Sequence, residues 1–69
     1  MDKELFGGQA QIERKLFTFS LRENLKGCFF KITEDVGGRR DTVIVPASGL
    51  PEVRNMIDKA WEICQEHKS

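Results

Sequence analysis

Polar and apolar residues alternate along the first two thirds of the chain, a pattern typical of β-strands with one buried face. Residues 15–23 (KLFTFSLRE) separate an apolar face from a polar one, and residues 28–36 (CFFKITEDV) repeat the pattern. Residues 40–46 predict a further strand that is apolar on both faces and is closed by Pro46, which cannot donate to a ladder. Residues 4–12 predict a weaker strand that its glycine pair bends or bulges.

The period changes to that of an amphipathic helix in residues 49–67. We expect Ser48 to cap the first turn and Pro51 to be tolerated there, because the early amides of a helix lack partners. One apolar stripe is formed by Leu50, Val53, Ile57, Ala60, Trp61 and Cys64. Met56 and Ile63 lie beside this stripe and widen it.

These elements predict one α+β domain, residues 1–69, with a four-stranded antiparallel sheet and one C-terminal helix across one face. A two-layer structure of this length has a small core. The widened helical stripe and the two-sided apolar strand therefore indicate a homodimer, in which these surfaces pack against a second copy. The expected dimer interface includes Ile44, Met56, Trp61 and Ile63.

The adjacent phenylalanines Phe29 and Phe30 must point to opposite faces of their strand. If Phe30 joins the core with Phe17 and Phe19, Phe29 lies on the face that the helix leaves open. By the same alternation, that face carries Thr18, Ser20, Arg22, Asn24, Lys31 and Thr33. An exposed ring beside cations suits single-stranded nucleic acid, since it can stack on an unpaired base.

The same ring is also consistent with a contact between proteins. The pattern alone leaves two functions open: nucleic-acid binding, and a homodimerisation or protein-interaction module without nucleic-acid binding of its own. The net charge does not decide between them, because 11 Lys and Arg balance 11 Asp and Glu. The distribution is uneven, since residues 13–40 hold seven basic and four acidic side chains, a net charge of +3.

Several function classes find no support in the sequence. The two cysteines are too few for a disulfide scaffold and too far apart for a metal knuckle, and the single histidine, His67, lies at the expected end of the helix. We therefore expect no enzyme, no metal, no cofactor and no small-molecule substrate. The absence of a long apolar run or a signal peptide predicts an intracellular protein, in the nucleus or cytoplasm, that does not enter a membrane.

Three segments resemble one repeat of the purine-rich element binding (Pur) proteins: RENLKGCFFKI at 22–32, PASGL at 46–50 and EVR at 52–54. Pur repeats carry a segment of the form Lys-x-Asn-x-Lys/Arg-Gly-Arg-Phe-Leu-Lys/Arg-Ile. The resemblance covers nearly the whole chain and implies a ββββα repeat of the Whirly-like class, two copies of which intertwine. It also implies binding of purine-rich single-stranded DNA or RNA, with a role in transcription or RNA regulation.

Carried over to this chain, the resemblance implies that Asn24 reads base edges and that Phe29 stacks on a base or wedges between bases to separate duplex strands. The full expected nucleic-acid-binding set is Arg14, Arg22, Asn24, Lys26, Phe29, Lys31 and Arg39. The chain departs from the family pattern at Cys28, where an arginine is common, and in the turn Glu13-Arg14. It holds a single repeat, so two copies are expected to pair whether or not the chain is part of a longer protein.

Overall fold

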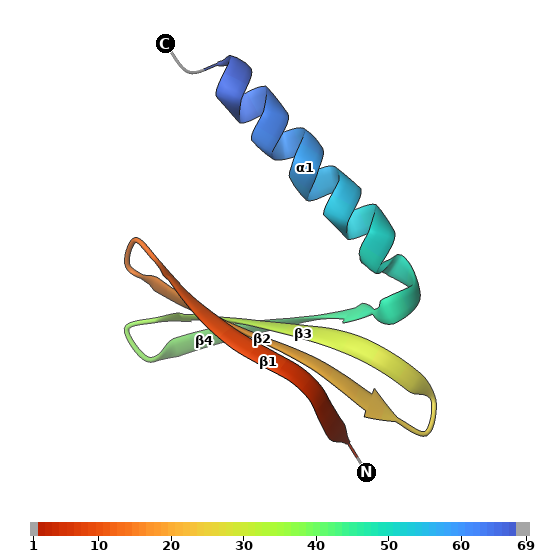
Figure 1. Cartoon of the computed structure of the whole chain (residues 1–69). Coiled ribbons are helices and arrows are strands. Elements are labelled where there is room, and N and C mark those ends of the chain that lie inside the picture. Colours follow the sequence, from red (N-terminus) through yellow and green to blue (C-terminus); the bar gives the residue numbers. More distant parts are fainter. Residues whose placement is uncertain (1, 68–69) are drawn as a thin grey trace.

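The computed structural model describes residues 2–67, which form a four-stranded antiparallel sheet followed by a helix (Figure 1). The elements are β1 (Lys3–Ile12), β2 (Lys15–Asn24), β3 (Gly27–Val36), β4 (Arg39–Pro46), a 3₁₀ turn (Ala47–Gly49) and α1 (Leu50–Glu66). The strands lie in the sheet in the order in which they occur in the chain. The α+β architecture predicted from the alternation is therefore confirmed.

Two-residue turns join the strands and fix their register. The closing pairs are Ile12 with Lys15, Asn24 with Gly27, and Val36 with Arg39. In the last of these turns Gly37 and Gly38 have φ angles of 59° and 88°, the left-handed conformation that a tight hairpin turn of this kind requires. Because a slip of one residue would exchange the two faces of a strand, these short turns decide which side chains share a face.

A ladder of aromatic rings lines the face of the sheet toward α1. The ring centroids of Phe17 and Phe19 are 6.4 Å apart, and those of Phe19 and Phe30 are 6.0 Å apart, with both pairs nearly parallel. Stacked rings at these separations attract one another beyond the area that they bury. The expectation that Phe30 packs with Phe17 and Phe19 is confirmed.

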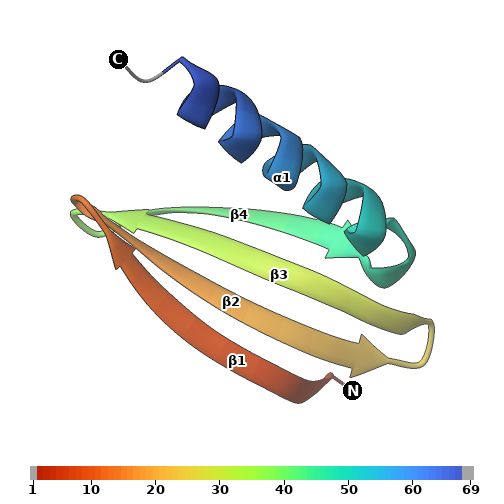
Figure 2. The same ribbon diagram turned by 45° about the horizontal axis from the view of Figure 1, so that its top comes forward.

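The helix does not lie across the sheet as we expected from the two-layer pattern. The 3₁₀ turn and the first turn of α1 meet the sheet, and the rest of the helix then rises away from it (Figures 1 and 2). Between them is an apolar cavity of about 500 Å³, lined by Phe19, Phe30, Leu50 and Ile57 among others. The expected cap is also wrong, since Ser48 lies within the 3₁₀ turn and no side chain caps α1, which begins after Gly49.

In residues 2–67 no apolar side chain is fully buried. The accessible surface is 5988 Å², whereas a compact protein of this size is expected to expose about 4,400 Å². The radius of gyration is 14.2 Å, against about 11 Å for a compact domain of this length. The single chain thus leaves a large apolar surface uncovered. Over the same residues, no helix has the length and apolar character needed to cross a membrane.

Candidate nucleic-acid interface

The face of the sheet away from α1, called the open face below, is polar along most of its length. Cross-strand pairs place Arg22 beside Phe29, Ser20 beside Lys31, and Thr18 beside Thr33. The hydroxyls of Thr33 and Thr42 are hydrogen-bonded at 3.2 Å, and the amide of Gln9 donates to Thr18 at 3.5 Å. The side chains that alternation assigned to the open face on β2 and β3 therefore lie together there.

Phe29 lies half-buried in an open groove of about 370 Å³ at one end of this face. The walls of the groove include Asn24, Lys26, Ile44 and Pro46. Pro46 and Ile44 enter it because β4 pairs Pro46 with Phe29, and Ile44 with Lys31. The groove is mostly apolar, and the cation Lys26 lies at its rim. This arrangement suits a nucleotide, whose flat base can pack in the groove while its phosphate meets the lysine.

Asn24 helps to build the turn beside the groove. Its side-chain carbonyl accepts a hydrogen bond of 2.8 Å from the backbone amide of Lys26. Asn side chains commonly close turns in this way. This bond uses one of the two lone pairs of the carbonyl, and the NH₂ group of Asn24 remains to donate to a ligand.

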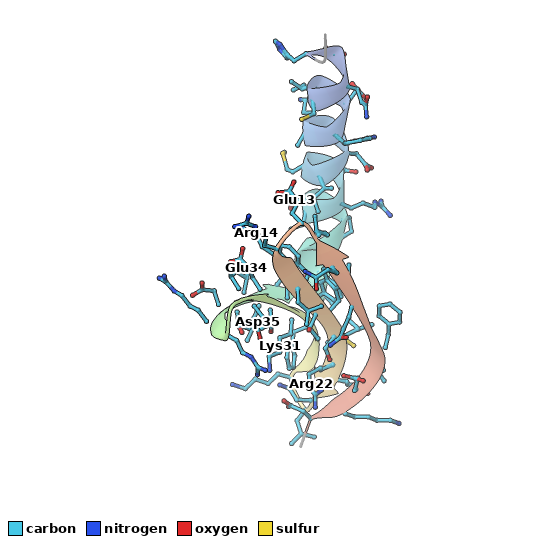
Figure 3. The ribbon with its side chains drawn as sticks, turned by 90° about the vertical axis from the view of Figure 1, so that its left-hand side faces the viewer. Glu13, Arg14, Arg22, Lys31, Glu34 and Asp35 are labelled. Atoms are coloured by element: carbon cyan, nitrogen blue, oxygen red, sulfur yellow. The ribbon has the colours of Figure 1, made fainter. Side chains whose placement is uncertain are left out.

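The cations of the open face differ in their surroundings. Lys31 is exposed and, within residues 2–67, forms no ion pair. Arg22 is 28% exposed and lies between Glu4 at 3.4 Å and Asp2 at 3.8 Å. Arg40 is paired with Asp35 at 3.0 Å. Figure 3 shows Arg22 and Lys31 in the same part of the sheet, where both line one shallow pocket.

Two of the predicted site residues lie apart from the groove. Arg14 is in the turn between β1 and β2, and Figure 3 shows it at the tip of that turn, away from Arg22 and Lys31. Since the ten residues of β2 separate this turn from Asn24, the two ends of the sheet are about 30 Å apart. Arg39 is also at the far end, and its pairing with Val36 places it on the face toward α1.

The predicted dimer residues do not share one surface. Met56, Trp61 and Ile63 are exposed on α1, with Met56 66% and Trp61 61% accessible. Ile44 lies on the opposite side of the sheet, next to Lys31, whereas its neighbours Val43 and Val45 face the helix. The structure therefore brings Ile44 to the groove of Phe29 and separates it from the helical residues.

Sequence reasoning missed three residues that shape this interface: Glu4, Ile44 and Pro46. The sequence pattern of β4 did not predict which of its residues face which side of the sheet, because that strand is apolar on both faces. Glu4 was hidden by a register shift between Glu4 and Phe6, just before the glycine pair that was expected to bend the strand. In the part of the chain that the structure describes, no three His, Cys, Asp or Glu side chains form a group that could hold a metal ion.

Comparison with known proteins finds a relative in Arabidopsis thaliana, transcription factor Pur-alpha 1, which is 47% identical over 49 residues. The aligned segment covers 71% of this chain but only 17% of that protein, so the chain spans about a sixth of the relative's length. No protein-family model matches the chain.

Proposed function

We propose, from the premise that this chain carries a Pur-like repeat, that it binds single-stranded DNA or RNA of purine-rich sequence. The relative is named a transcription factor, and we extend to this chain a role in regulating transcription or RNA. The proposal includes no catalytic activity, no cofactor and no metal. It also includes separation of duplex strands, with the ring of Phe29 entering between bases.

The observation that carries this proposal is the position of Phe29. An aromatic ring lies on the polar face of the sheet, in a groove whose rim holds Lys26, and Lys31 projects from the same strand two residues further on. Stacking of one unpaired base on such a ring contributes about 1 to 3 kcal/mol. Neutralising phosphates with lysines adds a contribution that does not depend on sequence and that weakens as salt is raised.

We further propose that two copies of the chain form an intertwined homodimer. The single chain exposes about 1,600 Å² more than a compact protein of its size, whereas a stable interface of standard size buries about 800 Å² on each partner. The uncovered surface includes the apolar helical residues Ile57 and Trp61 and the cavity that Ile57 lines. A second copy packed there would complete the core and leave the open face accessible.

The test is a titration of a labelled purine-rich single-stranded oligonucleotide, as DNA and as RNA, at about 50 mM and about 200 mM salt. We expect the wild-type chain to bind, and to bind more weakly at the higher salt. The double variant Phe29→Ala, Lys31→Ala should bind roughly tenfold more weakly or worse, because it removes one stacking ring and one phosphate contact. Sedimentation of the same samples establishes that the variant keeps its assembly state.

Affinity that ignores salt, or that survives the double substitution, would contradict the proposal. The second candidate function is protein docking, which the exposed apolar surface of α1 favours. A pull-down with the tagged chain after nuclease treatment separates the two functions. Partners that stay bound after nuclease treatment, from a chain that does not bind the oligonucleotide, would favour docking.

A further inference from the structure

Two carboxylates surround Arg22, which belongs to the nucleic-acid-binding set expected from the sequence. Arg22 Nη1 lies 3.4 Å from Glu4 Oε1, and Arg22 Nε lies 3.8 Å from Asp2 Oδ2. Ser20 donates a hydrogen bond of 2.7 Å to the same Glu4 oxygen and so holds that carboxylate in place. The three charged groups together carry one positive and two negative charges. The cluster of Arg22, Glu4 and Asp2 is therefore net negative, and the exposed Lys31 lies beside it on the proposed nucleic-acid face.

The backbone of β1 builds the position of Glu4. A register shift between Glu4 and Phe6 places Glu4 directly opposite Arg22. The carboxylate then lies over Gly7, where a Cβ would be 2.9 Å from Glu4 Oε2. Any larger residue at position 7 would push the carboxylate away. Ser20, the hydrogen-bond donor, is also the buried polar residue of the described chain, at 8% exposure. The contact thus depends on three separate features: the bulge, the glycine and the buried hydroxyl.

We propose that Glu4, together with Asp2, competes with nucleic-acid phosphate for Arg22 and so limits the electrostatic part of binding. This inference rests on the proposed function, since it concerns the same open face. A phosphate that approached Arg22 would come within a few ångströms of the carboxylates of Glu4 and Asp2. These negative charges would repel it. Lys26 and Lys31, which have no carboxylate partner among residues 2–67, then hold the phosphates, and stacking on Phe29 contributes a larger share of the affinity.

The experiment is a double-mutant cycle measured by fluorescence anisotropy, with a labelled purine-rich single-stranded DNA at about 50 mM and about 200 mM salt. The four proteins are the wild type, Arg22→Ala, the pair Asp2→Asn with Glu4→Gln, and that pair combined with Arg22→Ala. We expect Arg22→Ala to change the wild-type affinity by less than about twofold, because its charge is already neutralised. The carboxylate-free pair should bind several-fold more tightly, with a salt slope steeper by about 0.7, the value for one further phosphate on a single strand. Arg22→Ala should abolish that gain.

A second variant tests the geometry without removing a charge. Gly7→Ala should displace the flexible end of Glu4 from Ser20 and Arg22, and it should reproduce part of the gain in affinity. The matched control is Glu62→Gln with Glu66→Gln, which removes two exposed carboxylates of α1, on a different element from Arg22. Circular dichroism and sedimentation establish that each variant keeps its fold and assembly.

The inference is overturned if Arg22→Ala weakens the wild type as strongly as it weakens the carboxylate-free pair, or if the control pair gains as much affinity as Asp2→Asn with Glu4→Gln. These outcomes leave the proposed function intact, because the wild type still binds. If none of the proteins binds the oligonucleotide at either salt concentration, the proposed function fails and this inference fails with it.

Discussion

The two faces of the sheet differ in the kind of side chain that they leave exposed. The face toward α1 holds three stacked phenylalanines and is bordered by apolar side chains that stay exposed, such as Phe6 and Val43, each 59% accessible. The open face carries paired hydroxyls, the ion pairs of Arg22 and Arg40, the exposed Lys31 and one ring, Phe29. An apolar face of that extent needs a protein surface to cover it. A polar face with one half-buried ring in an open groove suits a ligand that is itself both flat and charged.

The largest effect is expected from a substitution in the apolar surface between α1 and the sheet. In Ile57→Glu, a carboxylate replaces a side chain that lines the cavity between α1 and the sheet. If a second copy fills that cavity, the buried charge should lower stability by about 3 kcal/mol or more and shift the chain toward monomer or unfolded protein. Sedimentation and urea denaturation followed by circular dichroism measure both changes.

The control for this substitution is Asn55→Glu. Residues 55 and 57 lie on opposite sides of the helix, because two residues turn it by about 200°. The control introduces the same side chain on the outward face and should leave assembly and stability nearly unchanged. Equal behaviour of the two variants would show that the apolar side of α1 is not covered in solution.

Much of this two-faced arrangement was predictable from the sequence because the turns are short. Clean alternation in β2 and β3, joined by the turn at Leu25 and Lys26, fixed the opposite orientations of Phe29 and Phe30. The phase of β4 was not predictable, since valine and isoleucine follow one another there. The pattern therefore did not indicate on which face of the sheet Ile44 and Arg39 lie. The structure places Arg39 toward the helix.

The remaining differences arise from interactions that a pattern of apolar residues does not encode. The stripe on α1 indicates which side of the helix is apolar, but it does not indicate whether this chain or another one covers it. Likewise the strand at 4–12 was expected to bend at its glycines, whereas the bulge precedes them and brings Glu4 opposite Arg22. The bulge changes the pairing of the residues that precede it in β1, so the charge surrounding Arg22 could not be derived from composition.

The next effect concerns the ring on the open face. Phe29→Ala should weaken binding of a single-stranded purine-rich oligonucleotide by about 1 to 3 kcal/mol, which is roughly 5- to 150-fold. The salt slope should not change, because no charge is removed. Phe29→Trp should retain the affinity, since its larger ring also stacks. If the tryptophan variant binds as weakly as the alanine variant, Phe29 does not act by stacking.

A smaller effect is expected from Lys31, which forms no ion pair with any of residues 2–67. Lys31→Ala should reduce the salt slope by about 0.7 and weaken binding several-fold at low salt, with little loss at high salt. Lys59→Ala is the matched control, because Lys59 is exposed on α1. Equal slopes for the two variants would place the phosphates somewhere other than beside Lys31. A smaller slope for Lys31→Ala alone would sharpen the contrast between the open face and the helix.

The smallest effect concerns an ion pair on the face toward α1. Lys15 Nζ lies 2.8 Å from Glu34 Oε2, and the hydrogen bond and charge of Glu34 raise the pKa of Lys15 above 10.5. Because the folded pKa is the higher one, the stabilisation is complete below the unfolded value and is lost as pH rises through the raised pKa. Wild type and Lys15→Met should therefore differ slightly and by a constant amount in thermal midpoint near neutral pH, and they should converge only above about pH 10.5. A difference that already disappears between pH 7 and pH 9 would mean that the pair does not form in solution.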